Sequence, residues 1–164
     1  MKINRVVVGP LETNCYILSI DNKCLVIDPG DEYTKIKEII GNKEVVGVII
    51  THYHFDHIGA LDNFDKTLIL DRNNLKEKEY NLGSFIFEII YTPGHKEDSI
   101  TLYFKDEKVM FTGDFIFKGA IGRMDLPGGN EKDMMNSLEK IKKYDKNIKI
   151  YPGHGEYTYL SNIT

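Results

Sequence analysis

Cysteine is scarce in this 164-residue chain, and no apolar run is long enough to cross a membrane. Cys15 and Cys24 each lie inside an apolar, strand-like stretch, and a free thiol packs like a small hydrophobic side chain. We therefore expect no disulfide, no cysteine nucleophile and no cysteine-rich structural metal site. A transmembrane helix needs about 18 or more consecutive apolar residues, so no membrane-spanning segment and no membrane partner are expected.

Positive charge is also in short supply. The 21 Lys and Arg residues against 25 Asp and Glu residues give a net charge of -4, which argues against nucleic acid as the main partner. The first residues, MKINR, lack the long apolar stretch and small-residue cleavage site of a signal peptide, so we expect a cytoplasmic protein. The length and the lack of repeats or linkers predict one domain over residues 1–164.

The order of strand-like and helix-like segments predicts a mixed α/β (α+β) fold. Apolar or alternating runs bounded by Gly and Pro indicate strands, and apolar residues at helical spacing indicate helices, the last one capped by Asn130. The expected strands are 2–8, 14–20, 23–27, 45–50, 67–70, 85–91, 100–104, 108–112 and 148–151. The expected helices are 34–40, one through residues 58, 61 and 64, and 131–143. Residues 72–80 are expected to form a solvated helix or loop, and 119–129 a glycine-rich loop.

Three of the five histidines lie within residues 51–59, where the sequence reads THYHFDHIG. An apolar run that reads as a buried strand leads into this stretch. His52 and His54 are two residues apart, so an extended backbone directs both side chains to one side. Asp56 and His57 follow where the helix is expected to begin. Imidazoles and a carboxylate gathered at a strand end are typical ligands of first-row metals.

The remaining histidines and one aspartate follow other apolar strands. His95, Asp114 and His154 each come directly after a glycine at the end of a predicted strand, and glycine allows a close approach of the backbone. If these strands lie side by side, their ends meet at one edge, where α/β sheets commonly place their active sites. The sequence therefore predicts one site built from four separate segments.

Taken together, these motifs resemble the metallo-β-lactamase superfamily over nearly the whole chain. The resemblance rests on HxHxDH at 52–57, TPGH at 92–95, GD at 113–114 and PGHG at 152–155. Asp28, within VIDPG at 26–30, is similar to the first motif of that superfamily. The chain looks most like the short, single-domain relatives of glyoxalase II (hydroxyacylglutathione hydrolase), whose loop the segment GRMDLPGG at 122–129 resembles. The resemblance implies a four-layer αβ/βα sandwich.

The resemblance also implies a site for two divalent metal ions, expected to be zinc, with iron or manganese as alternatives. Three side chains would hold the first metal: His52, His54 and His95. Three others would hold the second: Asp56, His57 and His154. Asp114 would bridge the two metals. Coordination positions then stay open for water and substrate, as in a catalytic rather than a structural site.

The expected mechanism follows from the two cations. Together they lower the pKa of a bridging water and make hydroxide available near neutral pH, while one of them polarises the substrate carbonyl. Asp56 and Asp114 are accordingly the expected catalytic carboxylates, and no serine or cysteine nucleophile is needed. Asp28 is expected to orient a metal ligand; a structural role at a turn is the alternative.

Substrate contacts are expected in the loop after Asp114. Arg123 carries a guanidinium that suits a carboxylate, and Lys118 and Lys96 are weaker candidates. In glyoxalase II of the two-domain kind, a lysine and a tyrosine of this loop contact glutathione, and Arg123 and Asp125 stand in their places here. The sequence therefore favours hydrolysis of a small-molecule thioester without assigning glutathione.

A C-terminal helical domain also helps two-domain glyoxalase II to bind glutathione. Only ten residues follow His154 here, so we expect that domain to be absent. Inserted RNA-processing domains and a flavodoxin domain, found in other branches of the superfamily, are not expected either.

Other functions stay open. The same site would suit hydrolysis of another ester, a lactone or a β-lactam, or a mononuclear iron persulfide dioxygenase. Persulfide dioxygenases have a similar loop but tend to end in an Ala-His-Asp type motif, whereas this chain reads PGHG at 152–155, which favours the hydrolase. A metal-binding module without enzymatic activity has no reason to keep open coordination positions.

Overall fold

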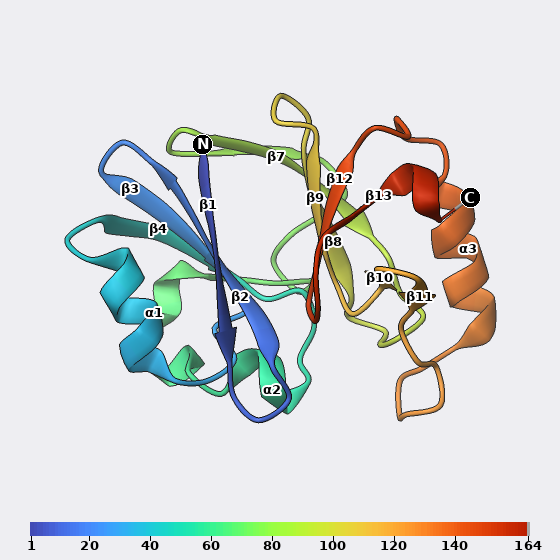
Figure 1. The fold of residues 1–164 in the computed structure, drawn as a ribbon, viewed down its shortest axis with the longest axis horizontal. Helices are drawn as coiled ribbons and strands as arrows, with labels where there is room; N and C mark the ends of the chain where they lie inside the picture. The colour runs from blue at the N-terminus through green and yellow to red at the C-terminus, as the bar shows by residue number, and fades with distance from the viewer. Residues whose placement is uncertain (164) are drawn as a thin grey trace.

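Two β-sheets packed face to face form the centre of the molecule, with helices on their outer sides (Figure 1). This is a computed structural model, and it describes residues 1–163. The first sheet has the order β1-β2-β3-β4-β5, with bounds Lys2–Val8, Thr13–Ile20, Lys23–Ile27, Glu44–Ile49 and Ile69–Leu70. The second has the order β13-β12-β9-β8-β7-β6. In chain order β6, β7, β8, β9, β12 and β13 span Glu79–Leu82, Phe85–Tyr91, Ile100–Phe104, Val109–Gly113, Lys149–Pro152 and Thr158–Tyr159.

The helices are few and lie outside the sheets. They are α1 (Tyr33–Ile40), α2 (Phe55–Ile58) and α3 (Glu131–Ile141), together with the 3-10 turns η1 (Leu61–Asn63), η2 (Lys66–Leu68) and η3 (Leu160–Asn162). The small pair β10 (Ile116–Phe117) and β11 (Ala120–Ile121) stands apart from both sheets. Figure 1 shows α1 beside the first sheet on the left and α3 beside the second on the right.

Three separate apolar clusters hold these layers together. Side chains of β2 alternate, so that Leu18 packs between the sheets while Ile17 packs with Ile36 of α1. On the far side, Met134 of α3 packs with Met110 of β9. The order helix, sheet, sheet, helix confirms the predicted four-layer αβ/βα sandwich.

Local sequence signals explain most element boundaries. The Asn130 side chain accepts a hydrogen bond from the Asp133 N–H at 2.9 Å, which confirms it as the N-cap of α3. Gly41 ends α1 with a φ of 59° and donates its N–H to the Lys37 carbonyl. The turn between Ile20 and Lys23, which are paired across β2 and β3, closes the predicted hairpin.

The helix expected after the histidine motif is shorter than its apolar spacing indicated. The Ala60 N–H bonds to the Pro29 carbonyl at 2.9 Å instead of continuing the helix. A side chain at Gly59 would overlap the Gly30 carbonyl, so the backbones of the two loops are in close contact. The apolar positions still pack as expected, with Ile58, Leu61 and Phe64 in the cluster under the first sheet.

The polar segment 72–80 is a loop with turns up to residue 78, as one of the two expectations had it, and not a helix. It ends in β6, which pairs with β7 at the edge of the second sheet, with Tyr80 opposite Phe87. Charged residues are common on edge strands because they discourage pairing with another chain. The charges of this segment are therefore compatible with a strand, although they made it read as a solvated helix or loop. Helix α3 ends at Ile141, two residues earlier than expected, and the loop 119–129 contains the short strand β11.

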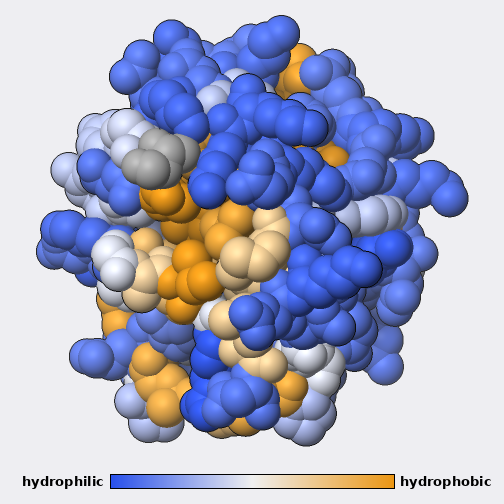
Figure 2. Space-filling model, turned by 90° about the vertical axis from the view of Figure 1, so that its right-hand side faces the viewer, coloured by the Kyte–Doolittle hydropathy of each residue, from blue (hydrophilic) through white to orange (hydrophobic). Residues whose placement is uncertain are grey.

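Figure 2 shows the face that carries α3 and η3. Hydrophobic side chains gather near its middle within a largely hydrophilic surround. A hollow of about 320 Å³ on this side is lined by residues of the β10–β11 pair and of the C-terminal turn, including Phe117, Ile121 and Ile163. Within residues 1–163, none of the helices has the length and apolar character needed to cross a bilayer.

Candidate metal centre

Four chain segments meet where the two sheets adjoin. The segments follow β4, β7, β9 and β12 and carry the motif 52–57, His95, Asp114 and His154 respectively. Backbone hydrogen bonds hold them together: the Gly153 N–H bonds to the Gly113 carbonyl at 2.8 Å, and the Ile100 N–H bonds to the Thr51 carbonyl at 2.9 Å. The convergence that the sequence predicted for these strand ends is present in the structure.

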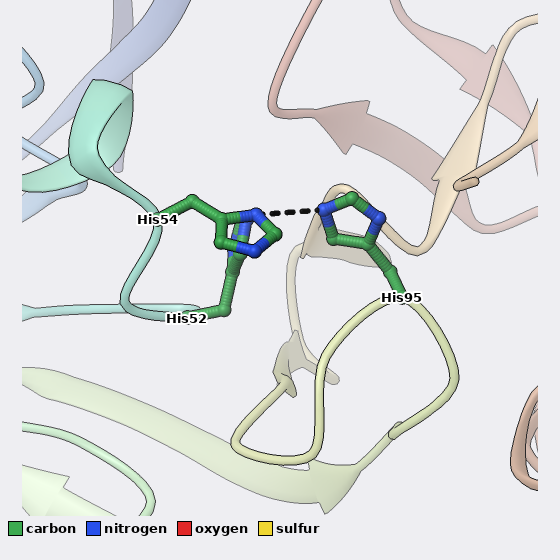
Figure 3. A group of neighbouring side chains, drawn as sticks. All are labelled: His52, His54 and His95. Carbon is green, nitrogen blue, oxygen red and sulfur yellow. Dashed lines mark hydrogen bonds between the residues drawn. The ribbon is translucent and has the colours of Figure 1, made fainter. Parts of the chain in front are cut away.

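Three histidines form the first group of candidate ligands. One ligand atom from each of His52, His54 and His95 lies within 4.8 Å of the other two. Figure 3 shows His52 and His54 on one loop and His95 on another, with one ring nitrogen of His54 directed at one of His95. The His95 Nε2 and His54 Nδ1 atoms are 3.0 Å apart.

Two carboxylates and two histidines form the second group, which consists of Asp56, His57, Asp114 and His154. The Asp56 Oδ2 atom lies 3.4 Å from His57 Nε2 and 3.2 Å from His154 Nε2. Asp114 Oδ1 lies 3.2 Å from His57 Nε2. Mixed imidazole and carboxylate donors suit zinc, iron and manganese alike.

Asp114 lies between the two groups. Its Oδ2 atom is 3.6 Å from His52 Nε2 and 3.5 Å from His95 Nε2, both in the first group. The same oxygen is 3.4 Å from His154 Nε2 in the second group. One carboxylate therefore reaches both sets of donors, as a bridging ligand must.

The distances between the donor atoms suit shared coordination of metal ions better than hydrogen bonds between the donors themselves. Bonds of about 2.1 Å to a tetrahedral ion separate neighbouring donors by roughly 3.4 Å, and the distances around Asp114 lie close to this value. Of the five buried side-chain atoms without a hydrogen-bond partner within residues 1–163, three lie at this site: His52 Nε2, His57 Nε2 and Asp114 Oδ1. Buried polar atoms without partners are costly, and metal coordination would satisfy all three.

Hydrogen bonds to the outer nitrogens fix how the histidines point. The His95 Nδ1 atom lies 2.8 Å from the Arg123 carbonyl, and the His154 Nδ1 atom lies 3.1 Å from the Leu11 carbonyl. A carbonyl can only accept, so each Nδ1 carries a proton, and in the neutral imidazole Nε2 is the nitrogen whose lone pair is directed at the site.

Asp28 fixes two further histidines through its buried carboxylate. Its Oδ2 atom accepts a hydrogen bond from His57 Nδ1 at 2.7 Å and another from the Thr51 hydroxyl at 2.6 Å. Thr51 Oγ1 in turn lies 3.0 Å from His52 Nδ1. Asp28 thus contacts His57 directly and His52 through Thr51, an arrangement consistent with the expectation that it orients metal ligands.

Two histidines of the first group, His54 and His95, favour the neutral form that binds metals. Burial and the neighbouring imidazoles of His52 and His95 lower the pKa of His54 to about 4. Burial also lowers the pKa of His95, against the effect of its bond to the Arg123 carbonyl. At neutral pH, His54 and His95 therefore offer free lone pairs.

The second group carries a strong negative field. Burial alone would lower the pKa of His154, but hydrogen bonds to Asp114 and Asp56 outweigh it and raise that pKa to about 10. Burial alone would raise the pKa of Asp56, but His154, the charge on His57 and the Thr13 hydroxyl lower it to about 2. This field stabilises positive charge, whether a proton or a metal cation.

The three basic side chains expected to contact substrate differ in position. Arg123 lines the cleft over the site, but its Nε and Nη2 atoms bond to the Asp125 carboxylate at 2.7 and 2.8 Å. Lys96 lines the same cleft and lies 3.4 Å from Asp98 Oδ1. Lys118 is largely exposed and faces Glu156, with 3.7 Å between Nζ and Oε2.

The sequence did not point to the residues that hydrogen-bond to the candidate ligands and hold them in place. Thr51 links Asp28 to His52, and the backbone of Leu11 holds His154. Thr13 donates its hydroxyl hydrogen to Asp56 Oδ2 at 3.0 Å, and Asn14 bonds to the loop that carries His154. Each acts through a backbone group or a contact distant in sequence, so no local pattern points to it.

The sequence matches the profile of the Metallo-beta-lactamase superfamily at residues 8–72 and 68–154. It is 34% identical to "Probable metallo-hydrolase YqgX" of Bacillus subtilis (strain 168), with 96% of this chain and 92% of that protein covered. It is 30% identical to "Hydroxyacylglutathione hydrolase GloC" of Haemophilus influenzae, with 98% and 93% covered.

Two solved structures are similar over nearly the whole chain. The B3 metallo-β-lactamase BLEG-1 matches with a TM-score of 0.92 and 27% identity, covering 98% of this chain and 95% of that one. TTHA1623, solved in a di-iron-bound form, matches with a TM-score of 0.86 and 27% identity, covering 96% and 95%.

These matches, the sandwich fold and the two donor groups agree. The chain belongs to the metallo-β-lactamase superfamily. It is a metal-binding hydrolase of that superfamily, and its relatives include hydroxyacylglutathione hydrolases that are 30–31% identical to it.

Proposed function

We propose that this protein hydrolyses thioesters in the manner of glyoxalase II, with two divalent metal ions, zinc being the first choice. One observation carries the proposal: both oxygens of Asp114 lie within 3.2–3.6 Å of histidine donors, and these donors belong to two different groups. A single-metal site has no need of a carboxylate placed in this way. The similarity to a hydroxyacylglutathione hydrolase supports the thioester as substrate.

Two bound divalent ions would supply Lewis acidity and a water of lowered pKa. The chain's own residues would hold and orient these ions: His52, His54 and His95 on one side, Asp56, His57 and His154 on the other, and Asp114 between them. Asp28 keeps the proton on His57 Nδ1, so that Nε2 faces inward. Thr13 fixes the Asp56 carboxylate through Oδ2.

The residues around the site also favour a thioester over an amide. An amine leaving group must be protonated as the bond breaks, whereas a thiol with a pKa of about 8.5 leaves readily as a thiolate. Among the described residues that line the cleft and do not belong to the donor groups, the titratable side chains are Lys96 and Arg123. Both form ion pairs with carboxylates of this chain, so neither is placed to act as the general acid that would protonate an amine leaving group.

The test couples metal analysis to a thioester screen. The protein is loaded with zinc, iron or manganese, its metal content is measured, and hydrolysis of S-lactoylglutathione and of simpler acyl thioesters is followed. We expect about two metals per chain and turnover of at least one thioester. In Asp114→Ala, metal content and turnover should fall together, while the exposed variant Asp62→Ala should keep both.

The same screen tests the alternatives. The similarity to a B3 metallo-β-lactamase makes a β-lactam the second substrate to assay, together with a lactone. Oxygen uptake with glutathione persulfide and one iron per chain would identify a persulfide dioxygenase instead. A metal-loaded protein that hydrolyses none of the thioesters would overturn the proposal.

A further inference from the structure

Three large apolar side chains border the candidate site and are exposed to solvent. Phe55 is 75% exposed, Leu11 is 50% exposed and Leu126 is 37% exposed. They come from three separate segments: the start of α2, the turn between β1 and β2, and the loop before α3. Single exposed apolar side chains are common, but three that meet at one cleft mark a surface that a ligand covers.

All three line one cleft whose floor is the metal centre. This cleft has a volume of about 550 Å³, and its wall also includes Pro127. His54, Asp56, His95, Asp114 and His154 form the floor. A bond placed over the donor groups would therefore have its flanking atoms against Leu11, Phe55 and Leu126.

A second cleft of about 570 Å³ continues from the first. It shares Leu11 and Arg123 with the first cleft and ends against Phe117 and Gly155. Together the two clefts offer room on both sides of the donor groups, one for each half of a thioester. The Phe55 side has more large apolar groups than the Phe117 side.

The cations of the first cleft do not stand free for a charged ligand. Arg123 binds Asp125 through two of its nitrogens, and Lys96 lies 3.4 Å from carboxylate oxygens of both Glu97 and Asp98. Exposed ion pairs are weak, so they oppose the binding of a charged ligand less than the apolar wall favours an apolar one. The ion pairs of Lys96 and Arg123 nevertheless reduce the attraction that a free cation would exert on a substrate with several carboxylates.

We propose that the cleft bordered by Leu11, Phe55 and Leu126 takes an apolar acyl chain, and that the substrates are acyl thioesters selected by this chain rather than by glutathione. The inference rests on the proposed thioesterase function and specifies its substrate class. Burying one methylene is worth a factor of about four in affinity. Four methylenes would give roughly 200-fold if they were fully buried, and an open cleft should retain at least tenfold.

The test uses two matched substrate series with the metal-loaded protein. Acetyl, butyryl and hexanoyl groups are placed on N-acetylcysteamine, a small neutral thiol, and on glutathione. We expect kcat/KM to rise at least tenfold from acetyl to hexanoyl on both thiols, with less than a threefold preference for glutathione. A flat dependence on acyl length, or a preference of tenfold or more for glutathione, would overturn the inference.

Variants show which residues select the chain. Phe55→Ala and Leu11→Ala should each lower the hexanoyl-to-acetyl ratio of kcat/KM at least threefold at unchanged metal content; the Leu11 carbonyl that holds His154 is kept. Met135→Ala removes a comparably exposed side chain of α3, 44% exposed, and should leave the ratio unchanged. If both cleft variants behaved like this control, the assignment of the cleft would be wrong.

A binding measurement separates this inference from the proposed function. Ethyl and hexyl thioethers of N-acetylcysteamine cannot be hydrolysed, and their affinities can be measured by calorimetry. If no thioester is turned over, a hexyl thioether that binds at least tenfold more tightly than the ethyl one still supports the apolar cleft. Equal affinities would contradict the cleft, whatever the protein hydrolyses.

Discussion

The Asp28 carboxylate and the His57 imidazole form a buried pair, with 2.7 Å between Oδ2 and Nδ1. Asp28 adopts a left-handed backbone conformation with a φ of 53°, which only Gly, Asn and Asp adopt readily. This conformation allows one carboxylate to reach His57, the Thr51 hydroxyl and the Thr51 N–H together. The left-handed conformation of Asp28 therefore serves the orientation of the second donor group.

Asp28→Asn should weaken metal binding without unfolding the protein. Asparagine tolerates the left-handed conformation, but it lacks the charge that holds the proton on His57 Nδ1. Loss of such a supporting contact typically lowers metal affinity 10–100-fold, and we expect a loss in this range, measured by metal titration against a competing chelator. Asp21 is a matched control, since it has a φ of 51° and is exposed. Equal metal affinities of Asp28→Asn and Asp21→Asn would contradict the role of Asp28.

Gly153 leaves no room for a side chain beside the metal centre. An added Cβ would overlap Asp114 Oδ1 and lie 2.8 Å from His57 Cε1, so Gly153→Ala should reduce metal affinity at least tenfold. Gly155 in the same loop differs in that it has room for a side chain. Its φ of +77° strains an alanine, but the added Cβ meets nothing within 4 Å. Gly155→Ala should cost about 1 kcal/mol of stability and keep its metals, which metal analysis and thermal unfolding can distinguish.

Asn14 connects the first sheet to the loop that carries His154. Its side-chain amide donates to the Pro152 carbonyl at 3.0 Å and to the Gly155 carbonyl at 2.8 Å. Asn14→Ala removes both bonds and should cost about 2 kcal/mol, which corresponds to roughly 4–8 °C in Tm for a protein of this size. Metal affinity should fall as well, because the loop loses its support. The exposed Asn147→Ala should change neither quantity, and a similar Tm for both variants would exclude this role for Asn14.

Local patterns in the sequence predicted most of the strands and the candidate donor residues, whereas the four layers of the fold were implied by the resemblance to the superfamily. Alternating and apolar runs identified the strands, and the strand-end histidines with Asp114 drew attention to one edge. The supporting contacts were not predictable in this way. Asn14 and Pro152 are far apart in sequence, and Leu11 holds His154 through a backbone carbonyl that any residue possesses. The backbone contact between Gly30 and Gly59 likewise shortened a helix that spacing alone had extended.

Metal removal should loosen the contact between the two halves of the molecule. The donors of the motif 52–57 follow β4 of the first sheet, whereas His95, Asp114 and His154 follow strands of the second, so bound ions would link the two sheets. At a free metal concentration of 100 times the dissociation constant, binding to the folded state adds about 2.7 kcal/mol. Chelation should then lower Tm by roughly 5–11 °C.

The Asp114→Ala variant is the control for this experiment, because its Tm should change much less when the chelator is added. Thermal unfolding followed by circular dichroism, with metal content measured on the same samples, provides both quantities. If the wild-type protein kept its Tm after complete metal removal, the ions would not link the sheets. The donor groups would then be held in place by the hydrogen bonds of Asp28, Thr51 and Asn14 alone, and metal binding to the folded chain would be too weak to add stability.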